Sequence, residues 1–195
     1  MVFWGNSMCP VNAKHDLGRI EHFEDRPFCP YYSQQAINNI GMMEIHIRAA
    51  GVEDLKHILH HRRAMFEEIG FRDAAVLGRV EDLSREYFEE ALRIGTYRAW
   101  LAEDLNGQIV GGGGIVIADW PGYPGENHAQ RAWILNMYTE PRSRRRGVAK
   151  RLMEAMIEWC RTKGFRAVSL HASSAGRPLY ETMGFQQTNE MTLKL

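Results

Sequence analysis

The spacing of apolar residues changes several times along the chain, and each spacing predicts an element of secondary structure. Apolar positions recur every three or four residues over 52–69 and over 148–163, which is typical of amphipathic helices. Gly70 suits the C-terminal end of the first of these helices. A shorter pattern of the same kind predicts another helix over 85–94, with Ser84 as its N-cap.

Alternating or continuous apolar runs, bounded by turn residues, predict strands. These runs cover 45–48, 97–103, 108–118, 133–139, 167–172 and 185–195. Asn106 and Gly107 form a strong hairpin turn signal between the second run and the third. With a short helix over 176–183, the order is β-α-α-β-β-β-α-β-α-β. This order predicts an α/β sandwich built on a mixed, twisted sheet.

Four consecutive glycines, 111–114, interrupt the third strand run. Alone they would suggest a flexible linker, but apolar β-branched residues flank them on both sides. We therefore expect a bulged strand whose missing side chains leave room for a ligand.

Residues 1–41 show neither helical nor alternating periodicity, and they mix prolines and glycines with scattered aromatic residues. They predict an irregular N-terminal extension, followed by one folded domain over 42–195. Met42 and Met43 directly precede the first strand. Two interpretations stay open: the natural protein starts there and the preceding residues are not native, or a genuine extension packs on the domain.

The composition narrows the class of protein. The chain has 195 residues, of which 45% are apolar and 25% are charged, as in an ordinary soluble domain. Its 24 basic residues balance its 24 acidic ones, which argues against non-specific nucleic-acid binding. No apolar run has the length of a membrane span, and we see no signal peptide. The three cysteines are an odd number, and Cys160 falls on the apolar face of a helix, so we expect a cytoplasmic protein.

The most informative stretch is 133–151, in which a strand runs into a helix through a basic turn. Pro141 ends the strand, five residues with four arginines follow (142–146), and Gly147 precedes the helix. The N–H groups of a helix start lack internal partners and attract anions, so the N–H groups of 145–149 predict a phosphate site. The plain alternative is an exposed basic cluster or a nuclear-localisation signal. The absence of Gly-x-x-x-x-Gly-Lys-Ser/Thr argues against a nucleotide P-loop.

Here the chain resembles a known family. Residues 144–149 read Arg-Arg-Arg-Gly-Val-Ala and match the Arg/Gln-x-x-Gly-x-Gly/Ala signature of the GNAT N-acetyltransferase superfamily. Residues 179–185 read Leu-Tyr-Glu-Thr-Met-Gly-Phe and are similar to that family's Leu-Tyr-Glu-x-x-Gly-Phe ending. The resemblance covers roughly 45–195. It implies a three-layer sandwich with a mixed, mostly antiparallel central sheet flanked by helices.

The resemblance also implies a binding site for acetyl-coenzyme A (acetyl-CoA), with no metal. The residues expected to bind the cofactor are Met137, Tyr138, Thr139, Arg144, Arg145, Arg146, Gly147, Val148, Ala149, Ser173 and Tyr180. The backbone of 137–139 would pair with the pantetheine arm, and the Met137 N–H would polarise the thioester carbonyl. Ser173 stands where many relatives carry an asparagine that bonds the pantetheine; serine can also form a hydrogen bond, but its side chain is shorter and reaches less far.

The expected catalytic residues are Tyr180, Glu140 and His171. Tyr180 matches the family tyrosine that protonates the departing thiolate, and an ordinary phenol is protonated at neutral pH. The base that takes the proton of the amine stays open between Glu140, His171 and a carboxylate acting through water. His57 and His61 are spaced as metal ligands can be, but no third ligand is evident.

The resemblance implies an N-acetyltransferase that moves an acetyl group from acetyl-CoA to a primary amine of a small molecule or a protein. The alternative is a non-catalytic acyl-CoA-binding sensor domain. We expect the acceptor at the helices 52–70 and 85–95 and at the loop 119–130. Acidic side chains there would attract a cationic acceptor: Glu67, Glu68, Asp119 and Glu126. Nucleic acid and membrane are not expected as partners, and relatives commonly form homodimers.

Overall fold

The computed structural model describes residues 44–122, 124–125 and 129–194, so the extension expected over 1–41 lies outside them. The strands are β1 (Ile45–Ala50), β2 (Tyr97–Asp104), β3 (Ile109–Asp119), β4 (Gln130–Thr139) and β5 (Val168–Leu170). The helices are α2 (Leu55–Glu68), α3 (Ala74–Ile94), α4 (Val148–Thr162) and α5 (Arg177–Thr182), with 3₁₀ turns η1 (Val52–Asp54) and η2 (Pro141–Ser143). In this part of the chain, no helix is long and apolar enough to cross a membrane.

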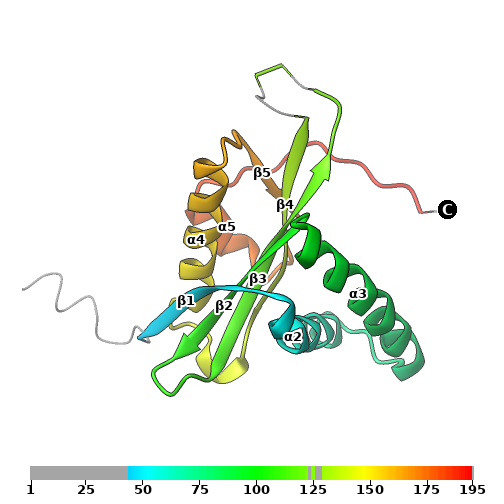
Figure 1. Ribbon diagram of the computed structural model, residues 1–195, viewed down its shortest axis with the longest axis vertical. Coiled ribbons are helices and arrows are strands. Elements are labelled where there is room, and N and C mark those ends of the chain that lie inside the picture. The colour runs from blue at the N-terminus through cyan, green and yellow to red at the C-terminus, as the bar shows by residue number, and fades with distance from the viewer. Residues whose placement is uncertain (1–43, 123, 126–128, 195) are drawn as a thin grey trace, which may run out of the picture. The chain divides into compact units, whose positions relative to one another are not determined.

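The five strands form one sheet in the order β1-β2-β3-β4-β5. The first three pairs are antiparallel, and β4 and β5 are parallel. Helices α2 and α3 cover one face of the sheet, and α4 and α5 cover the other (Figure 1). The expected three-layer sandwich with a mostly antiparallel sheet is therefore confirmed.

Side chains of each strand alternate between two cores. On β2, Tyr97 and Ala99 pack with α2 and α3, whereas Trp100 and Ala102 pack with α4. The predicted burial of Cys160 is confirmed, since it is 3% exposed in the α4 core. Burial raises the pKa of its thiol to about 11.

The turn predicted at Asn106 and Gly107 joins β2 to β3. Gly107 has a φ of 73°, in the left-handed region that glycine adopts without strain. The Asp104 carboxylate accepts hydrogen bonds from the backbone N–H groups of Asn106 and Gln108, both at 2.9 Å. This interaction fixes the turn.

The predicted start of α3 is wrong. The helix begins at Ala74, and its N-cap is Asp73, whose carboxylate accepts from the N–H groups of Ala75 and Val76. Ser84 lies in the middle of the helix and is buried. Its polar side chain occupies a core-facing position between Leu77 and Phe88, so the apolar pattern breaks there although the helix continues.

The strand predicted over 185–195 is also wrong, because residues 186–194 adopt no regular structure. Phe185 packs against the α4 core, but Met191 and Leu193 are 94% and 82% exposed. Five consecutive polar residues, 186–190, separate Phe185 from Met191. The first half of the segment therefore has no apolar face to bury against the sheet.

Candidate functional site

Strands β4 and β5 pair over a short distance and then separate. Their ladder has three pairs and ends at Ile134 and Leu170, whereas β4 continues to Thr139. Within the described residues, the β4 edge beyond Ile134 therefore has no strand beside it on the β5 side. Such an edge presents N–H and C=O groups to which an extended ligand can bind. The predicted residues Met137, Tyr138 and Thr139 all lie on it.

A β-bulge lies where this edge begins. Gly114 pairs with Leu135 and Gly112 with Tyr138, so Asn136 and Met137 together oppose the single residue Gly113. Asn136 has a φ of 58°, in the left-handed region. The bulge shifts the alternation of β4, and it moves the backbone around the Met137 N–H out of the regular ladder.

The four glycines do form an irregular strand, as expected, but the chain's own atoms fill the space beside them. A Cβ on Gly112 would lie 2.8 Å from His61 Nδ1, and one on Gly111 would lie 2.8 Å from the Tyr138 carbonyl oxygen. Those on Gly113 and Gly114 would overlap Met137 and Tyr97. The expectation that the missing side chains leave room for a ligand is wrong: the glycines make room for the bulge and for side chains of α2 and β2.

The basic turn leads directly from the β4 edge to the start of α4. Arg145 and Gly147 have φ values of 60° and 85°, so both lie in the left-handed region. Gly147 is the N-cap of α4 and has no side chain with which to satisfy the first N–H groups. These N–H groups and the positive end of the helix dipole both lie at the start of α4, and such groups favour the binding of an anion.

The arginines of this turn differ in what they contact. Arg144 pairs with Glu68 of α2 and donates from Nε to the Thr139 carbonyl oxygen at 2.9 Å, which ties the turn to the end of β4. Arg142 donates to Gln108 at 2.8 Å. Arg145 and Arg146 are exposed beside the start of α4. The residues predicted at 144–149 thus lie together at one helix terminus, where Val148 is buried in the core.

One buried polar atom lies at the end of this edge, and Tyr180 is the other polar group expected to act here. Among the described residues, Thr139 Oγ1 is a buried side-chain oxygen without a hydrogen-bond partner. Buried hydroxyl groups are normally paired, so an unpaired one at the end of an open strand edge fits a ligand that binds there. Tyr180 of α5 is half-buried, its ring centroid is 6.0 Å from that of Phe185, and desolvation raises the pKa of its phenol. The phenol therefore stays protonated at neutral pH.

Ser173 and His171 lie in the segment that follows β5. Ser173 Oγ accepts from the Gly176 N–H at 3.2 Å and so begins the turn into α5. His171 follows β5, contacts the Trp133 ring at 5.0 Å between centroids, and pairs with Glu190 at 3.1 Å.

Glu140 contacts two histidines of α2, although no sequence pattern connects these residues. Glu140 Oε1 lies 2.9 Å from His60 Nε2 and 3.9 Å from His61 Nε2. His61 is 2% exposed, and its burial, followed by the charges of His60 and His57, lowers its pKa to about 4. Glu140 is therefore held against α2 beside a neutral imidazole.

The acidic residues expected to attract a cation are mostly engaged. Glu67 pairs with Arg63 at 3.0 Å, Glu68 pairs with Arg144, and Asp119 accepts from Gln130 at 3.2 Å. Glu126 lies outside the described residues. Because their charge is shared with the chain's own cations, Glu67 and Glu68 give little support to a cationic acceptor.

Comparison with known proteins agrees with this geometry. The profile of the Acetyltransferase (GNAT) family matches residues 55–185. The chain belongs to this family. A comparison with curated proteins gave no match.

Solved structures show the same fold. A GCN5-related N-acetyltransferase from Ralstonia eutropha JMP134 is 33% identical, with a TM-score of 0.72 over 78% of this chain and 99% of that one. A predicted acetyltransferase from Clostridium acetobutylicum, solved with acetyl-CoA, is 28% identical, with a TM-score of 0.70 over 78% and 96%. An aminoglycoside N-acetyltransferase in complex with CoA is 20% identical, with a TM-score of 0.60 over 78% and 95%, a likeness of fold alone.

Proposed function

We propose that this protein transfers the acetyl group of acetyl-CoA to a primary amine of a small molecule or a protein. The observation that carries the proposal is the continuous path from the open β4 edge, past the bulge at Asn136, to the unsatisfied N–H groups at the start of α4. The path offers an extended backbone to the pantetheine arm and an anion site to the diphosphate. Further support comes from the Clostridium relative, whose structure contains acetyl-CoA.

The residues of the site fit this substrate. The N–H groups of 145–149, with the exposed side chains of Arg145 and Arg146, would bind the diphosphate. The backbone of 137–139 would pair with the amides of the pantetheine, and the Thr139 hydroxyl would gain the partner that it lacks. Each contact uses a group that is exposed, unsatisfied or on an unpaired edge.

The chemistry follows from these positions. The amine nitrogen attacks the thioester carbonyl carbon, and the negative charge that develops on the carbonyl oxygen is stabilised by the Met137 N–H. The C–S bond then breaks, and the sulfur takes the proton of the Tyr180 phenol, whose desolvation keeps it protonated. The proton that the amine loses goes to a base, and positioning of the two substrates supplies much of the rate.

Glu140, His171 and a carboxylate acting through water remain the candidate bases, and the two named residues lie in different surroundings. Glu140 contacts His60 and the buried His61, whereas His171 lies at the surface against Trp133. The variants Glu140→Gln and His171→Gln separate them. Loss of the acidic limb of the pH–rate profile in one variant, with unchanged CoA affinity, identifies the base.

The proposal is tested with the full chain by calorimetry with CoA, followed by thiol release from acetyl-CoA in the presence of a panel of primary amines. We expect CoA binding, and thiol release that depends on at least one amine. Binding without thiol release from any amine would instead indicate a sensor domain. No heat with CoA would reject both functions.

A further inference from the structure

Asn136 adopts a conformation that side chains other than glycine rarely take. Its φ is 58°, and it lies in the β4 bulge, 4% exposed. Asparagine tolerates the left-handed region better than most residues, but it adopts this region in a strand only when its surroundings impose it. Both ends of its side-chain amide are held, and these two contacts supply the constraint.

The first contact comes from the sheet. Asn136 Nδ2 donates to the hydroxyl oxygen of Tyr97 at 3.1 Å, and Tyr97 of β2 is 1% exposed. A Cβ on Gly114 would overlap this hydroxyl group, so the last glycine of the run is what admits it. The glycines and the tyrosine together define where the amide nitrogen lies.

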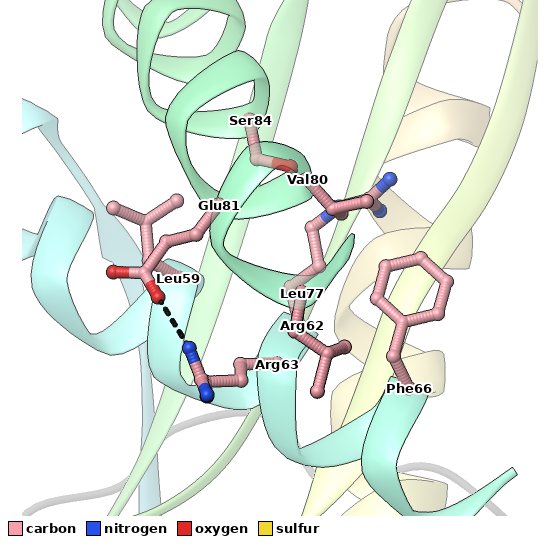
Figure 2. Close-up of a pocket in the computed structure, with 8 residues that line it drawn as sticks. All are labelled: Leu59, Arg62, Arg63, Phe66, Leu77, Val80, Glu81 and Ser84. Carbon is pink, nitrogen blue, oxygen red and sulfur yellow. Dashed lines mark hydrogen bonds and ion pairs between the residues drawn. The ribbon is translucent and has the colours of Figure 1, made fainter. Parts of the chain in front are cut away.

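The second contact comes from Arg62 of α2. Arg62 Nη1 donates to Asn136 Oδ1 at 2.7 Å, and its Nε donates to Ser84 Oγ of α3 at 2.9 Å. The guanidinium lies 4.8 Å from the Phe66 ring centroid and 5.6 Å from that of Phe88. Figure 2 shows the Arg62 side chain rising from α2 toward Ser84, with Phe66 beside it.

This guanidinium is unusual in its partners. Its hydrogen bonds within the described residues go to an amide and a hydroxyl, and none goes to a carboxylate. By contrast, the neighbouring Arg63 pairs with Glu67 and Glu81. Arg62 is half-buried, and desolvation of a guanidinium without a carboxylate beside it costs stability, so the arrangement needs another reason.

We propose that Arg62 is a positioning residue for acyl transfer, which acts through the Asn136 side chain to hold the β4 bulge in the shape that aims the Met137 N–H at the thioester carbonyl. Tyr97 holds the other end of the same amide. The inference rests on the proposed function, because it assigns the bulge a role in that reaction. Without Arg62, Asn136 loses one of its two restraints, and the bulge relaxes while the distant start of α4 is unchanged.

The test uses Arg62→Met, which keeps an unbranched apolar stem between Phe66 and Phe88 but removes the donors. Asn136→Ala removes the amide, and Tyr97→Phe removes a single oxygen and is the mildest of the three. Arg161→Met is the matched control, since the Arg161 side chain is 72% exposed and, among the described residues, pairs at 3.5 Å with Glu158, one turn earlier on α4.

Two affinities are measured for each variant: that of CoA, and that of its S-acetonyl derivative, a ketone that presents a carbonyl but cannot transfer an acyl group. In the wild type we expect the ketone to bind more tightly than CoA. In Arg62→Met and Asn136→Ala we expect that difference to disappear and kcat to fall at least 10-fold, with the Kd of CoA within 3-fold of wild type. Arg62→Lys should have a higher kcat than Arg62→Met. The double variant Arg62→Met/Asn136→Ala should be no slower than Asn136→Ala alone.

Two results would overturn the proposal: a kcat within 2-fold of wild type in Arg62→Met, or a parallel loss of kcat and CoA affinity, which indicates general damage. If Arg62→Met does not fold, Tyr97→Phe carries the same test. If the wild type does not bind CoA, the proposed function fails by itself. A crystal structure of Arg62→Met tests whether Arg62 holds the shape of the bulge. If Asn136 keeps its positive φ and the β3–β4 register is unchanged in this variant, the proposal is rejected.

Discussion

His61 makes the stability of this fold depend on pH in a way that can be measured. It lies on the inner side of α2, with its ring centroid 5.3 Å from that of Tyr138 and its Nδ1 against Gly112. The titratable groups around it are Tyr138, His57, His60 and Glu140. Burial lowers its pKa from 6.5 to about 4. The folded protein therefore keeps this imidazole neutral where the unfolded chain protonates it.

The sign and the size of this effect on the free energy of unfolding follow from proton linkage. Between pH 6.5 and about 4, the unfolded chain binds a proton that the folded protein does not, so acidification favours unfolding. The stabilisation is complete above pH 6.5 and is lost as the pH falls toward 4. From pH 7.5 to pH 5, this one group should lower the free energy of unfolding by about 2 kcal/mol.

The assay is urea unfolding of the wild type and of His61→Leu at pH 7.5 and at pH 5. Any constant effect of the substitution cancels, because each protein is compared with itself. We expect the acid-induced loss to be about 2 kcal/mol smaller in His61→Leu. The control is His171→Leu, which removes an imidazole whose side chain is 76% exposed and keeps the wild-type loss. Equal losses in wild type and His61→Leu would refute the reasoning.

Three further predictions concern the site and the core. Gly147→Ala places a Cβ at a φ of 85°, and keeping the turn in this conformation then costs about 1 kcal/mol of strain. We expect the free turn to relieve this strain, so that CoA binding must restore the conformation, and calorimetry should show the Kd of CoA rising roughly 5-fold. An unchanged Kd would argue against this turn as the diphosphate site. Tyr180→Phe should lower kcat about 100-fold in a thiol-release assay with little change in CoA affinity, because it removes only the proton donor; a normal kcat would exclude that role. In the Cys9→Ser/Cys29→Ser variant, Cys160 is the remaining thiol, and its pKa is raised to about 11. It should therefore resist a thiol reagent at pH 8 in the folded protein and react fully in urea. Rapid reaction in the folded protein would contradict its burial.

The sequence by itself determined the features that arise from short-range pattern. Across 133–151 the apolar pattern changes from that of a strand to that of a helix, with Pro141 and Gly147 between the two. This change predicted a strand, a basic turn and a helix start, and the structure has all three. The hairpin at Asn106 and Gly107 needs only local turn geometry, so it was also predictable. Signals of this kind depend on residues a few positions apart.

Only the tertiary structure decided which polar residues meet. Arg62 and Asn136 are 74 positions apart, and Asn136 and Tyr97 are 39 apart, so no periodicity connects them. Their contact depends on a bulge that places the neighbours Leu135 and Asn136 on the same side of the sheet, against the alternation that a regular strand would have. Likewise, Ser84 has the residue type of an N-cap, but it lies in the middle of α3 and accepts a hydrogen bond from Arg62 of α2. The role of a buried polar side chain depends on the group to which it is hydrogen-bonded, and this group can lie far away in the sequence. The packing of the helices on the sheet decides which partner it has.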